Sequence, residues 1–384
     1  MKQESQNCPA ASWFDAQFVI DGMPREDTPR SLLTEEYRPS KEETEPVVVS
    51  DETADPHLSA WTYRESGIPS YLEQMRACPY PFSLRYPESA ARLALAQALA
   101  ESLWRPGHFT FEQLRLSLLW KWDAAQLGAM AAFYQTCEAL GEYAESLRMD
   151  ADRLEWEDAA VCELLPRISV SPSPGDAPSA PVSPEAATPS PAFPSQSAVL
   201  PSQALPDTDS WLLYLPLDPC GFSLGGSLLS KVCGNPGDGP VETGDGDYLM
   251  DVYEIVREMV EDGIVLSGFT VGRGGLMTAL SGWCPDGADI DIAPLMRAYD
   301  LKETDETDRA RVLFGEVPGV LIQIADDDYD YVDAQCLLQD VAYYALGHPA
   351  VRASGAPDVA ARIHIAHNAS PALSTLLQAL MGRR

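Results

Sequence analysis

The hydrophobic and polar positions of this chain follow a mixed strand-and-helix pattern from residue 207 onward. Short apolar runs of strand type are interleaved there with longer segments whose apolar residues recur every three or four positions. Strands are predicted over 211–217, 264–271, 289–292, 320–324, 343–346 and 362–365, and helices over 248–261, 275–283, 305–314, 329–341 and 371–381. This interleaving predicts an α+β domain with its own core over residues 207–384.

The pattern over residues 56–165 is interpreted as a small all-α domain. A Pro-Glu-Ser sequence opens an Ala- and Leu-rich run from Ala90 to Trp104, and a further helix is predicted over 127–147. Thr110 and Gln113 form a capping-box pattern, which predicts that a helix begins there. Because that helix would be apolar almost all round, it is expected to be buried.

Two segments are expected to lack a core of their own. Residues 1–55 are rich in acidic residues and poor in apolar runs, which predicts a mostly disordered segment. One apolar island in it, from Trp13 to Ile20, could either dock on a partner or fold back onto a domain. Residues 166–206 are rich in Pro, Ser and Ala, a composition that predicts an extended, disordered spacer between two domains.

Composition limits the partners that this chain could bind. The formal net charge is -32 and the pI is about 4.3, so the chain repels phosphate backbones and anionic lipids. No nucleic-acid or membrane partner is therefore expected, although the same charge also serves solubility. The eight cysteines form no C-x-x-C pair and only five histidines are present, so neither a metal site nor a cofactor is expected.

The sequence favours a cytoplasmic protein. The scattered cysteines do not resemble a disulfide framework and are interpreted as reduced thiols. The N-terminus has no charged-then-apolar signal pattern. No window approaches the roughly 20 apolar residues that are needed to span a bilayer.

The most informative local feature is the glycine-rich turn over residues 268–276. It follows a strand-like run and leads into the apolar segment that begins at Leu276. A strand, a glycine turn and a helix in this order place backbone N–H groups where they can meet an anion. Glycine-rich turns are common, so the turn gains weight only from its surroundings.

Four segments in a fixed order carry a resemblance to a known family. They are 222–229, the glycine turn, 313–324 and the Gly-His-Pro sequence at 347–349. Together they resemble the C-terminal domain of the aminoimidazole ribonucleotide synthase (PurM) superfamily, and within it the phosphoribosylformylglycinamidine synthases of purine biosynthesis. The resemblance covers about residues 207–384, and none is seen in residues 56–165.

The resemblance implies a PurM C-terminal-like mixed sheet and a ligand site at the glycine turn. In the family the turn usually reads His-Asp-Val-Ser-Asp-Gly-Gly-Leu, and its acidic side chains help to hold magnesium and phosphate. Here Phe269 stands at the histidine position, while Thr270 and Arg273 stand at the two aspartate positions. The turn is retained, but the metal-binding carboxylates are not, so no catalytic or metal-binding residue is assigned.

The candidate ligand-binding residues combine the intact family motifs with the substituted arginine. Arg273 could bind an anion through a two-pronged guanidinium contact, helped by N–H groups near Gly274 and Gly275. It could instead simply pair with a carboxylate of this acidic chain. The full candidate set is Gly225, Gly226, Ser227, Arg273, Gly274, Gly275 and Glu316.

Three functional interpretations remain open at this point. The first is a purine-biosynthesis-related protein without a complete active site, able to bind a phosphate-bearing small molecule or ribonucleotide. It rests on two absences in the sequence, namely the N-terminal half that largely forms the family's ATP site and the glutaminase domain. The second is an active subunit that completes a split synthase with a separate ATP-binding chain. The third is a non-enzymatic interaction module, and a homo-oligomer is compatible with each.

Overall fold

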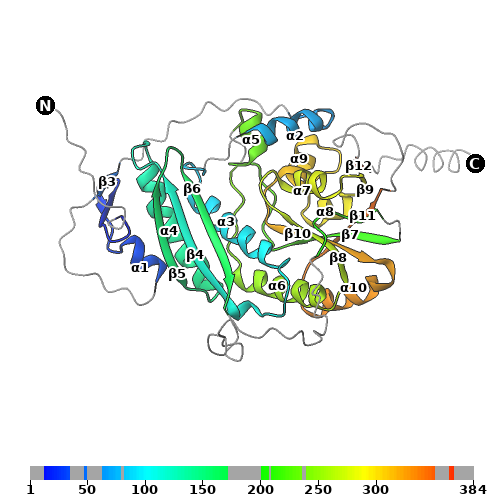
Figure 1. The fold of residues 1–384 in the computed structure, drawn as a ribbon. Coiled ribbons are helices and arrows are strands. Elements are labelled where there is room, and N and C mark those ends of the chain that lie inside the picture. Colours follow the sequence, from blue (N-terminus) through cyan, green and yellow to red (C-terminus); the bar gives the residue numbers. More distant parts are fainter. Residues whose placement is uncertain are drawn as a thin grey trace, which may run out of the picture.

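A computed structural model describes residues 13–34, 47–49, 63–78, 82–171, 200–206, 209–235, 239–350 and 363–366. It contains a six-stranded sheet and two three-stranded sheets, a larger one within residues 114–170 and a small one within residues 18–49. Helices α3 (Pro87–Ser102) and α6 (Gly246–Glu261) lie between the six-stranded sheet and the larger three-stranded sheet (Figure 1). None of the helices in the described ranges is both long and apolar enough to cross a membrane.

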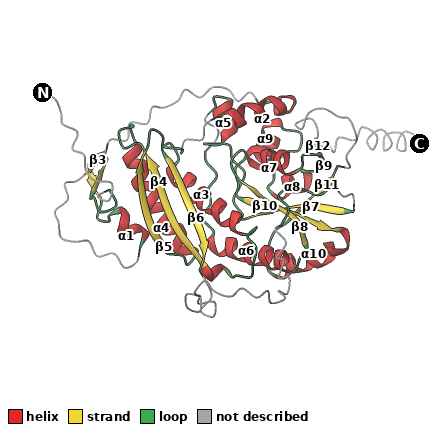
Figure 2. Ribbon diagram, viewed as in Figure 1, coloured by secondary structure: helices red, strands yellow, loops and turns green. Residues whose placement is uncertain are grey.

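The six-stranded sheet forms the centre of the C-terminal region. Its order is β12-β9-β11-β7-β10-β8, and every pairing is antiparallel except that of β12 with β9. The central strands are nearly continuous apolar runs because helices cover both of their faces (Figure 2). The strands are β7 (Ser210–Pro216), β8 (Val265–Val271), β9 (Ala288–Ile290), β10 (Gly319–Ala325), β11 (Tyr344–Pro349) and β12 (Ile363–Ile365).

Alternate residues of β7 point into two different core clusters. Leu213 and Leu215 pack in a cluster with α3 and α6, whereas Leu212 and Tyr214 pack in a cluster with helices on the opposite face. The remaining helices of this region are α5 (Leu228–Val232), α7 (Gly275–Trp283), α8 (Ala293–Ala298), α9 (Glu306–Phe314) and α10 (Tyr329–Leu338). The α+β prediction for this region is confirmed, and the helix predicted over 371–381 lies outside the described residues.

The larger three-stranded sheet, of order β5-β4-β6, corrects the prediction of an all-α domain. β4 (Leu114–Trp122) pairs with β5 (Ala151–Asp158) in parallel and with β6 (Glu163–Val170) antiparallel, and α3 and α4 (Ala129–Ser146) pack against it. The capping box does form, but it closes only a single 3₁₀ turn over Phe111–Gln113. The prediction of a buried helix after Thr110 is wrong. In residues 114–122 every second side chain is apolar and buried, and a repeat of two residues is the period of a strand.

The proposed spacer begins later than predicted. Residues 166–170 belong to β6, where Pro166 is tolerated because β6 is an edge strand. Residues 200–206 lie against the C-terminal sheet, since the side-chain amide of Gln323 donates to the carbonyl of Leu205 and accepts from its N–H. Residues 172–199, the rest of the predicted spacer, lie outside the described residues.

The N-terminal apolar island folds back onto the larger three-stranded sheet, to which β4 belongs. Residues 13–34 form β1 (Phe18–Ile20), β2 (Met23–Pro24) and α1 (Pro29–Leu33), and β1 also pairs with β3 (Val47–Val49). Phe14 is only 2% exposed and meets the edges of Trp120 and Phe133. The prediction of disorder is therefore wrong for residues 13–34, and the fold-back alternative is confirmed.

The region before residue 171 and the region after residue 209 share a core. One continuous hydrophobic cluster contains residues of α3, α4 and β4 together with residues of α6, β7 and β10. Helix α2 (Ile68–Ala77) instead contributes Leu72 and Met75 to the cluster around α7 and α9. The two halves of the described structure are thus joined by packed side chains.

Candidate functional site

The β8–α7 turn has the conformation that its glycines allow. Gly274 and Gly275 both have positive φ angles, of 82° and 68°. A Cβ atom added at Gly275 would lie 2.7 Å from the backbone of Phe314, so a larger residue would collide with the chain. The positive φ angles and the close approach to Phe314 require glycine here whether or not a ligand binds.

Glu316 occupies the positions that an anionic ligand would take at two helix N-termini. Its Oε1 atom accepts hydrogen bonds from the N–H of Gly274 at 2.9 Å and from the N–H of Leu228 at 2.8 Å. Burial raises the pKa of Glu316, and these two hydrogen bonds and the nearby Arg273 guanidinium partly oppose that rise. The carboxyl group thereby ties the start of α7 to the start of α5.

This geometry corrects the predicted role of the turn's N–H groups. The N–H of Gly274 already donates to Glu316, and the N–H of Gly275 donates to the carbonyl of Gly272 at 3.0 Å. Neither group is directed at an external anion. An anion bound here would have to be held by side chains instead.

The Leu-Gly-Gly-Ser motif is also held by internal contacts. A Cβ atom at Gly225 would lie 1.9 Å from the carbonyl oxygen of Gly239, so glycine allows two chain segments to touch. Gly226 has a positive φ of 72° and lies under the ring of Tyr86. Ser227 caps α5, because its hydroxyl accepts from the N–H of Ser230 at 3.1 Å.

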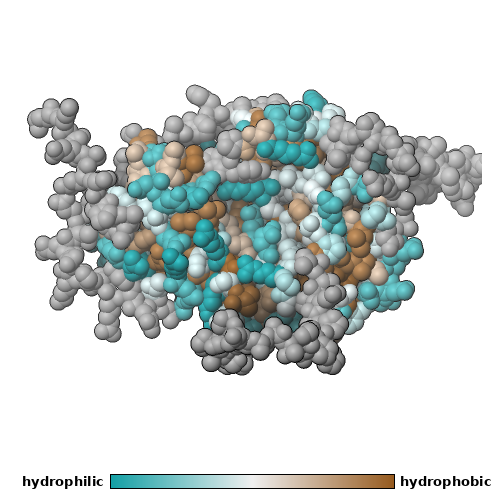
Figure 3. Space-filling view, in the orientation of Figure 1, coloured by the Kyte–Doolittle hydropathy of each residue, from teal (hydrophilic) through white to brown (hydrophobic). Residues whose placement is uncertain are grey.

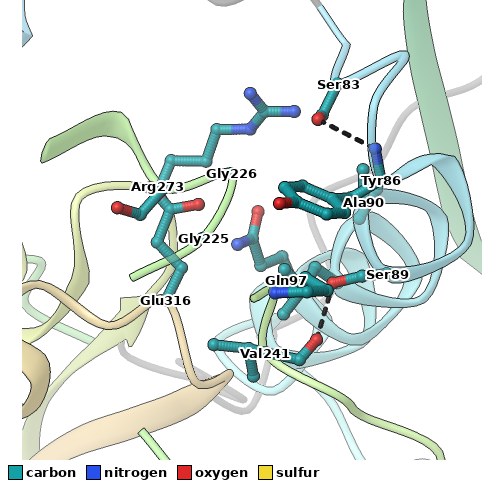
Figure 4. Close-up of a pocket in the computed structure, with 14 residues that line it drawn as sticks. Ser83, Tyr86, Ser89, Ala90, Gln97, Gly225, Gly226, Val241, Arg273 and Glu316 are labelled. Atoms are coloured by element: carbon teal, nitrogen blue, oxygen red, sulfur yellow. Dashed lines mark hydrogen bonds between the residues drawn. The ribbon is translucent and has the colours of Figure 1, made fainter. Parts of the chain in front are cut away.

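A small pocket brings most of the predicted residues together. Its volume is about 30 Å³, which leaves room for about two water molecules and excludes a nucleotide. Figure 4 shows the Arg273 side chain extending across it towards Ser83, with Tyr86 and Gln97 approaching from α3 and the segment before it. Of the predicted residues, Gly225, Gly226, Ser227, Arg273 and Glu316 line this pocket.

A larger cleft lies between α3 and the β8–α7 turn. Its volume is about 590 Å³, and Gln97 and Arg273 line both this cleft and the small pocket. Its lining residues include two arginines, Arg76 and Arg273, and one acidic residue, Glu101. The positions at which the turn departs from the family pattern, Phe269, Thr270, Gly272 and Arg273, all lie on its wall.

Thr270 joins the glycine turn's strand to the segment that follows α3. The indole N–H of Trp104 donates to the Thr270 hydroxyl at 2.9 Å, and the Trp104 ring packs so closely on Gly268 that a Cβ atom there would be 2.3 Å away. This contact fixes the C-terminal end of α3 against β8. No sequence pattern linked Trp104 to the turn, because the two are distant in the chain.

The described residues contain no group of three or more His, Cys, Asp or Glu side chains placed to hold a metal ion. The cleft residues themselves offer only Glu101 as a carboxylate. Hard divalent cations such as magnesium prefer several oxygen ligands. The charges of the cleft are therefore better suited to an anion than to a cation.

An α+β protein with a substituted PurM-type glycine turn is the class that this fold and site define. The chain is related, over part of its length, to phosphoribosylformylglycinamidine synthase. It is 28% identical over 251 residues to that enzyme of Homo sapiens and 26% identical over 268 residues to the probable chloroplastic/mitochondrial enzyme of Arabidopsis thaliana. No family model matches the chain.

The similarity covers most of this chain but little of its relatives. It includes 64% of this chain and 17% of the human enzyme, and 68% and 17% in the Arabidopsis comparison. A match of that extent cannot fit within residues 207–384, which are less than half of the chain. The predicted limit of the resemblance is therefore wrong, and related sequence extends upstream of residue 207.

Solved structures show only a loose correspondence. Thermotoga maritima PurL complexed with FGAR gives a TM-score of 0.45 at 14% identity and covers 68% of this chain and 39% of PurL. The hydrogenase maturation protein HypE gives a TM-score of 0.42 at 13% identity and covers 71% of this chain and 77% of that protein.

Proposed function

We propose that this chain is a purine-biosynthesis-related protein that binds a phosphate-bearing small molecule without catalysing phosphoryl transfer by itself. The proposed site is the cleft between α3 and the β8–α7 turn. One observation carries the proposal: the residues lining the cleft include two arginines, Arg76 and Arg273, and one acidic residue, Glu101, in a chain whose net charge is -32. Arg273 also lies near the buried carboxyl of Glu316, which lines the neighbouring small pocket. Cations gathered in a cleft of such an acidic protein favour an anionic ligand.

The size of the cleft agrees with this ligand class. Its volume of about 590 Å³ lies within the range of about 300–1,000 Å³ that is typical of small-molecule sites. Arginine is the side chain best suited to phosphate, because its planar fork can donate two parallel hydrogen bonds. The relatives' name specifies a phosphoribosyl compound, so a ribose 5-phosphate group is the ligand element that we expect.

The substituted turn supports the absence of independent catalysis. Phosphoryl transfer needs the charge of the transferred group to be neutralised, usually by magnesium held on carboxylates. Here Thr270 carries no negative charge, and its hydroxyl accepts a hydrogen bond from Trp104. Arg273 stands at the second of the two aspartate positions of the family pattern. One oxygen of the Glu316 carboxyl, Oε1, already accepts from the N–H groups of Gly274 and Leu228.

Thermal shift and titration calorimetry on the full chain test the binding proposal. Ribose 5-phosphate should stabilise the wild type, whereas ribose, which lacks the phosphate, should not. Arg273→Ala should weaken binding by on the order of 1.5–3 kcal/mol, the range for hydrogen bonds to charged groups. Arg297→Ala is the matched control, because Arg297 is an exposed arginine that pairs with Glu303 elsewhere on the surface.

Two results would contradict the binding proposal. One is the absence of any response to ribose 5-phosphate in the wild type, and the other is an equal response in the wild type and Arg273→Ala. Raised salt should weaken binding, because it screens a charge-dominated contact in an open cleft. Salt-independent binding would point to an apolar contact instead.

A separate assay addresses catalysis. The purified chain should not hydrolyse ATP in the presence of magnesium, and Thr270→Ala should change nothing. Magnesium-dependent turnover that survives rigorous purification and disappears in Thr270→Ala would contradict the non-catalytic assignment. Turnover that appears only when a second, ATP-binding chain is added would instead favour the split-synthase alternative.

A further inference from the structure

Helix α10 carries exposed apolar residues on the side that faces away from the core. Val332 and Cys336 point inward, into the core cluster that contains residues of α6 and β7. On the outward side, Leu337 and Leu338 are 78% and 80% exposed, and Figure 3 shows hydrophobic residues over the region that α10 occupies in Figure 1. Adjacent exposed apolar residues of this size mark an interaction site. We define the outer α10 face by Tyr331, Ala334, Leu337 and Leu338.

Acidic residues gather at the N-terminal end of α10. Asp326, Asp327 and Asp328 form the 3₁₀ turn that leads into the helix, and Asp330 follows in its first turn. The exposed leucines lie at the opposite end, in the last turn. A segment that fits this surface therefore needs apolar residues along one side and positive charge at one end.

Residues 371–384 have this composition, and we call them the leucine segment. A helix is predicted over 371–381, with Ser370 as its N-cap and Pro371 in its first turn. The leucines of this helix recur at the spacing of one helical face, at Leu373, Leu376, Leu377 and Leu380. The segment contains no Asp or Glu, although 58 of the 384 residues are acidic, and it contains Arg383 and Arg384.

The topology of the six-stranded sheet brings the leucine segment towards α10. Ile365 of β12 and Gly347 of β11 both pair with Ile290 of β9, and β12 runs antiparallel to β11. The chain therefore leaves β12 at the end of the sheet where α10 ends and β11 begins. β12 and β11 are two strand spacings apart, about 10 Å, and residues 367–371 can span up to about 17 Å.

We propose that the leucine segment binds the outer α10 face as a helix that runs antiparallel to α10. As a helix, residues 371–381 would extend about 16 Å and α10 extends about 15 Å, so the two lengths match. A segment that begins beside Leu337 and Leu338 and runs back along α10 would bring its two arginines to the aspartates of the 3₁₀ turn. A parallel arrangement would carry the arginines away from those aspartates, so the charges select the antiparallel one.

Hydrogen–deuterium exchange of the full chain, followed by mass spectrometry, tests the proposal. The backbone amides of the leucine segment should exchange at least about tenfold more slowly in the wild type than in Leu337→Ser with Leu338→Ser, because that double variant removes the apolar surface that protects them. Leu127→Ser is the matched control. Leu127 is 64% exposed and lies in the turn before α4, so its replacement should leave this exchange unchanged.

An exchange of charges tests the antiparallel direction. Asp326→Arg with Asp327→Arg should speed the exchange of the leucine segment, and adding Arg383→Asp with Arg384→Asp should slow it again, because opposite charges then meet once more. Asp247→Arg is the control for a positive charge at a helix N-terminus, since Asp247 is exposed and lies in the first turn of α6. Near-ultraviolet circular dichroism of each variant checks that its fold is retained.

Four outcomes would overturn the proposal. The first three are exchange of the leucine segment at the rate of an unstructured peptide in the wild type, slow exchange that Leu337→Ser with Leu338→Ser leaves unchanged, and a charge exchange that does not restore protection. The fourth is protection that appears only as the protein concentration is raised, since the segment of a second copy would then occupy the face. None of these outcomes depends on the ligand proposed above.

Discussion

Arg257 on α6 joins the two halves of the molecule, and its replacement gives the sharpest stability prediction. Its guanidinium donates to the carbonyls of Leu103 at 2.7 Å and Arg105 at 2.8 Å, and also to the carbonyl of Gly107. Its Nε–H donates to Glu261 at 2.8 Å, and its Cζ atom lies 4.0 Å from the centre of the Phe109 ring. One side chain on α6 thus caps the end of α3 and holds the loop after it.

Arg257→Met should be strongly destabilising. The methionine fills much of the same space but leaves three carbonyls and the Glu261 carboxylate without this donor. Because the Arg257 side chain is only 5% exposed, little solvent can replace the lost contacts. Removing one partner from such a buried charged network costs on the order of 3–5 kcal/mol, a large share of the roughly 5–15 kcal/mol that stabilises a typical domain.

Urea unfolding, followed by circular dichroism, measures the effect. Arg257→Met should lower the transition midpoint at a nearly unchanged slope, while Arg148→Met should lower the stability by no more than about 0.5 kcal/mol, since Arg148 makes only an exposed ion pair. Arg257→Lys should fall between them, because it keeps the charge but loses the fork. A free energy of unfolding for Arg257→Met within about 1 kcal/mol of the wild type would refute this account of the junction.

Two further predictions follow from Glu316 and from the shared core. Since burial raises the pKa of Glu316, its contribution to stability is fully present below the ordinary carboxyl pKa and is lost as pH rises through the folded-state value. The amide of Glu316→Gln can still accept from the N–H groups of Gly274 and Leu228 but does not titrate. In urea unfolding, the free energy of unfolding of Glu316→Gln should therefore rise relative to that of the wild type between pH 4 and pH 8. A difference between the two that does not change with pH would contradict this. Cleavage at a protease site inserted within 172–199 should leave two fragments that co-elute in gel filtration because they share a core, and fragments that separate without denaturant would count against one packed unit.

The sequence alone determined much of the C-terminal region. The apolar periods of 248–261 and 275–283 correspond to α6 and α7 because their hydrophobic faces repeat at the helical period and pack on the sheet. The glycine turn, the Leu-Gly-Gly-Ser motif and Glu316 were selected from the sequence, and the pocket brings Gly225, Arg273 and Glu316 together. Local patterns succeed there because each element's hydrophobic face agrees with the packing around it.

Only the tertiary structure decided the conformation of β4 and the hydrogen-bond partners of Glu316 and Thr270 at the candidate site. Residues 114–122 are apolar at both helical and strand periods, and pairing with β5 and β6 selects the strand. That Glu316 already accepts from Gly274, and that Trp104 binds Thr270, depends on contacts across 42 and 166 positions of the chain. No local pattern encodes such contacts, because they arise when distant segments are packed into a shared core.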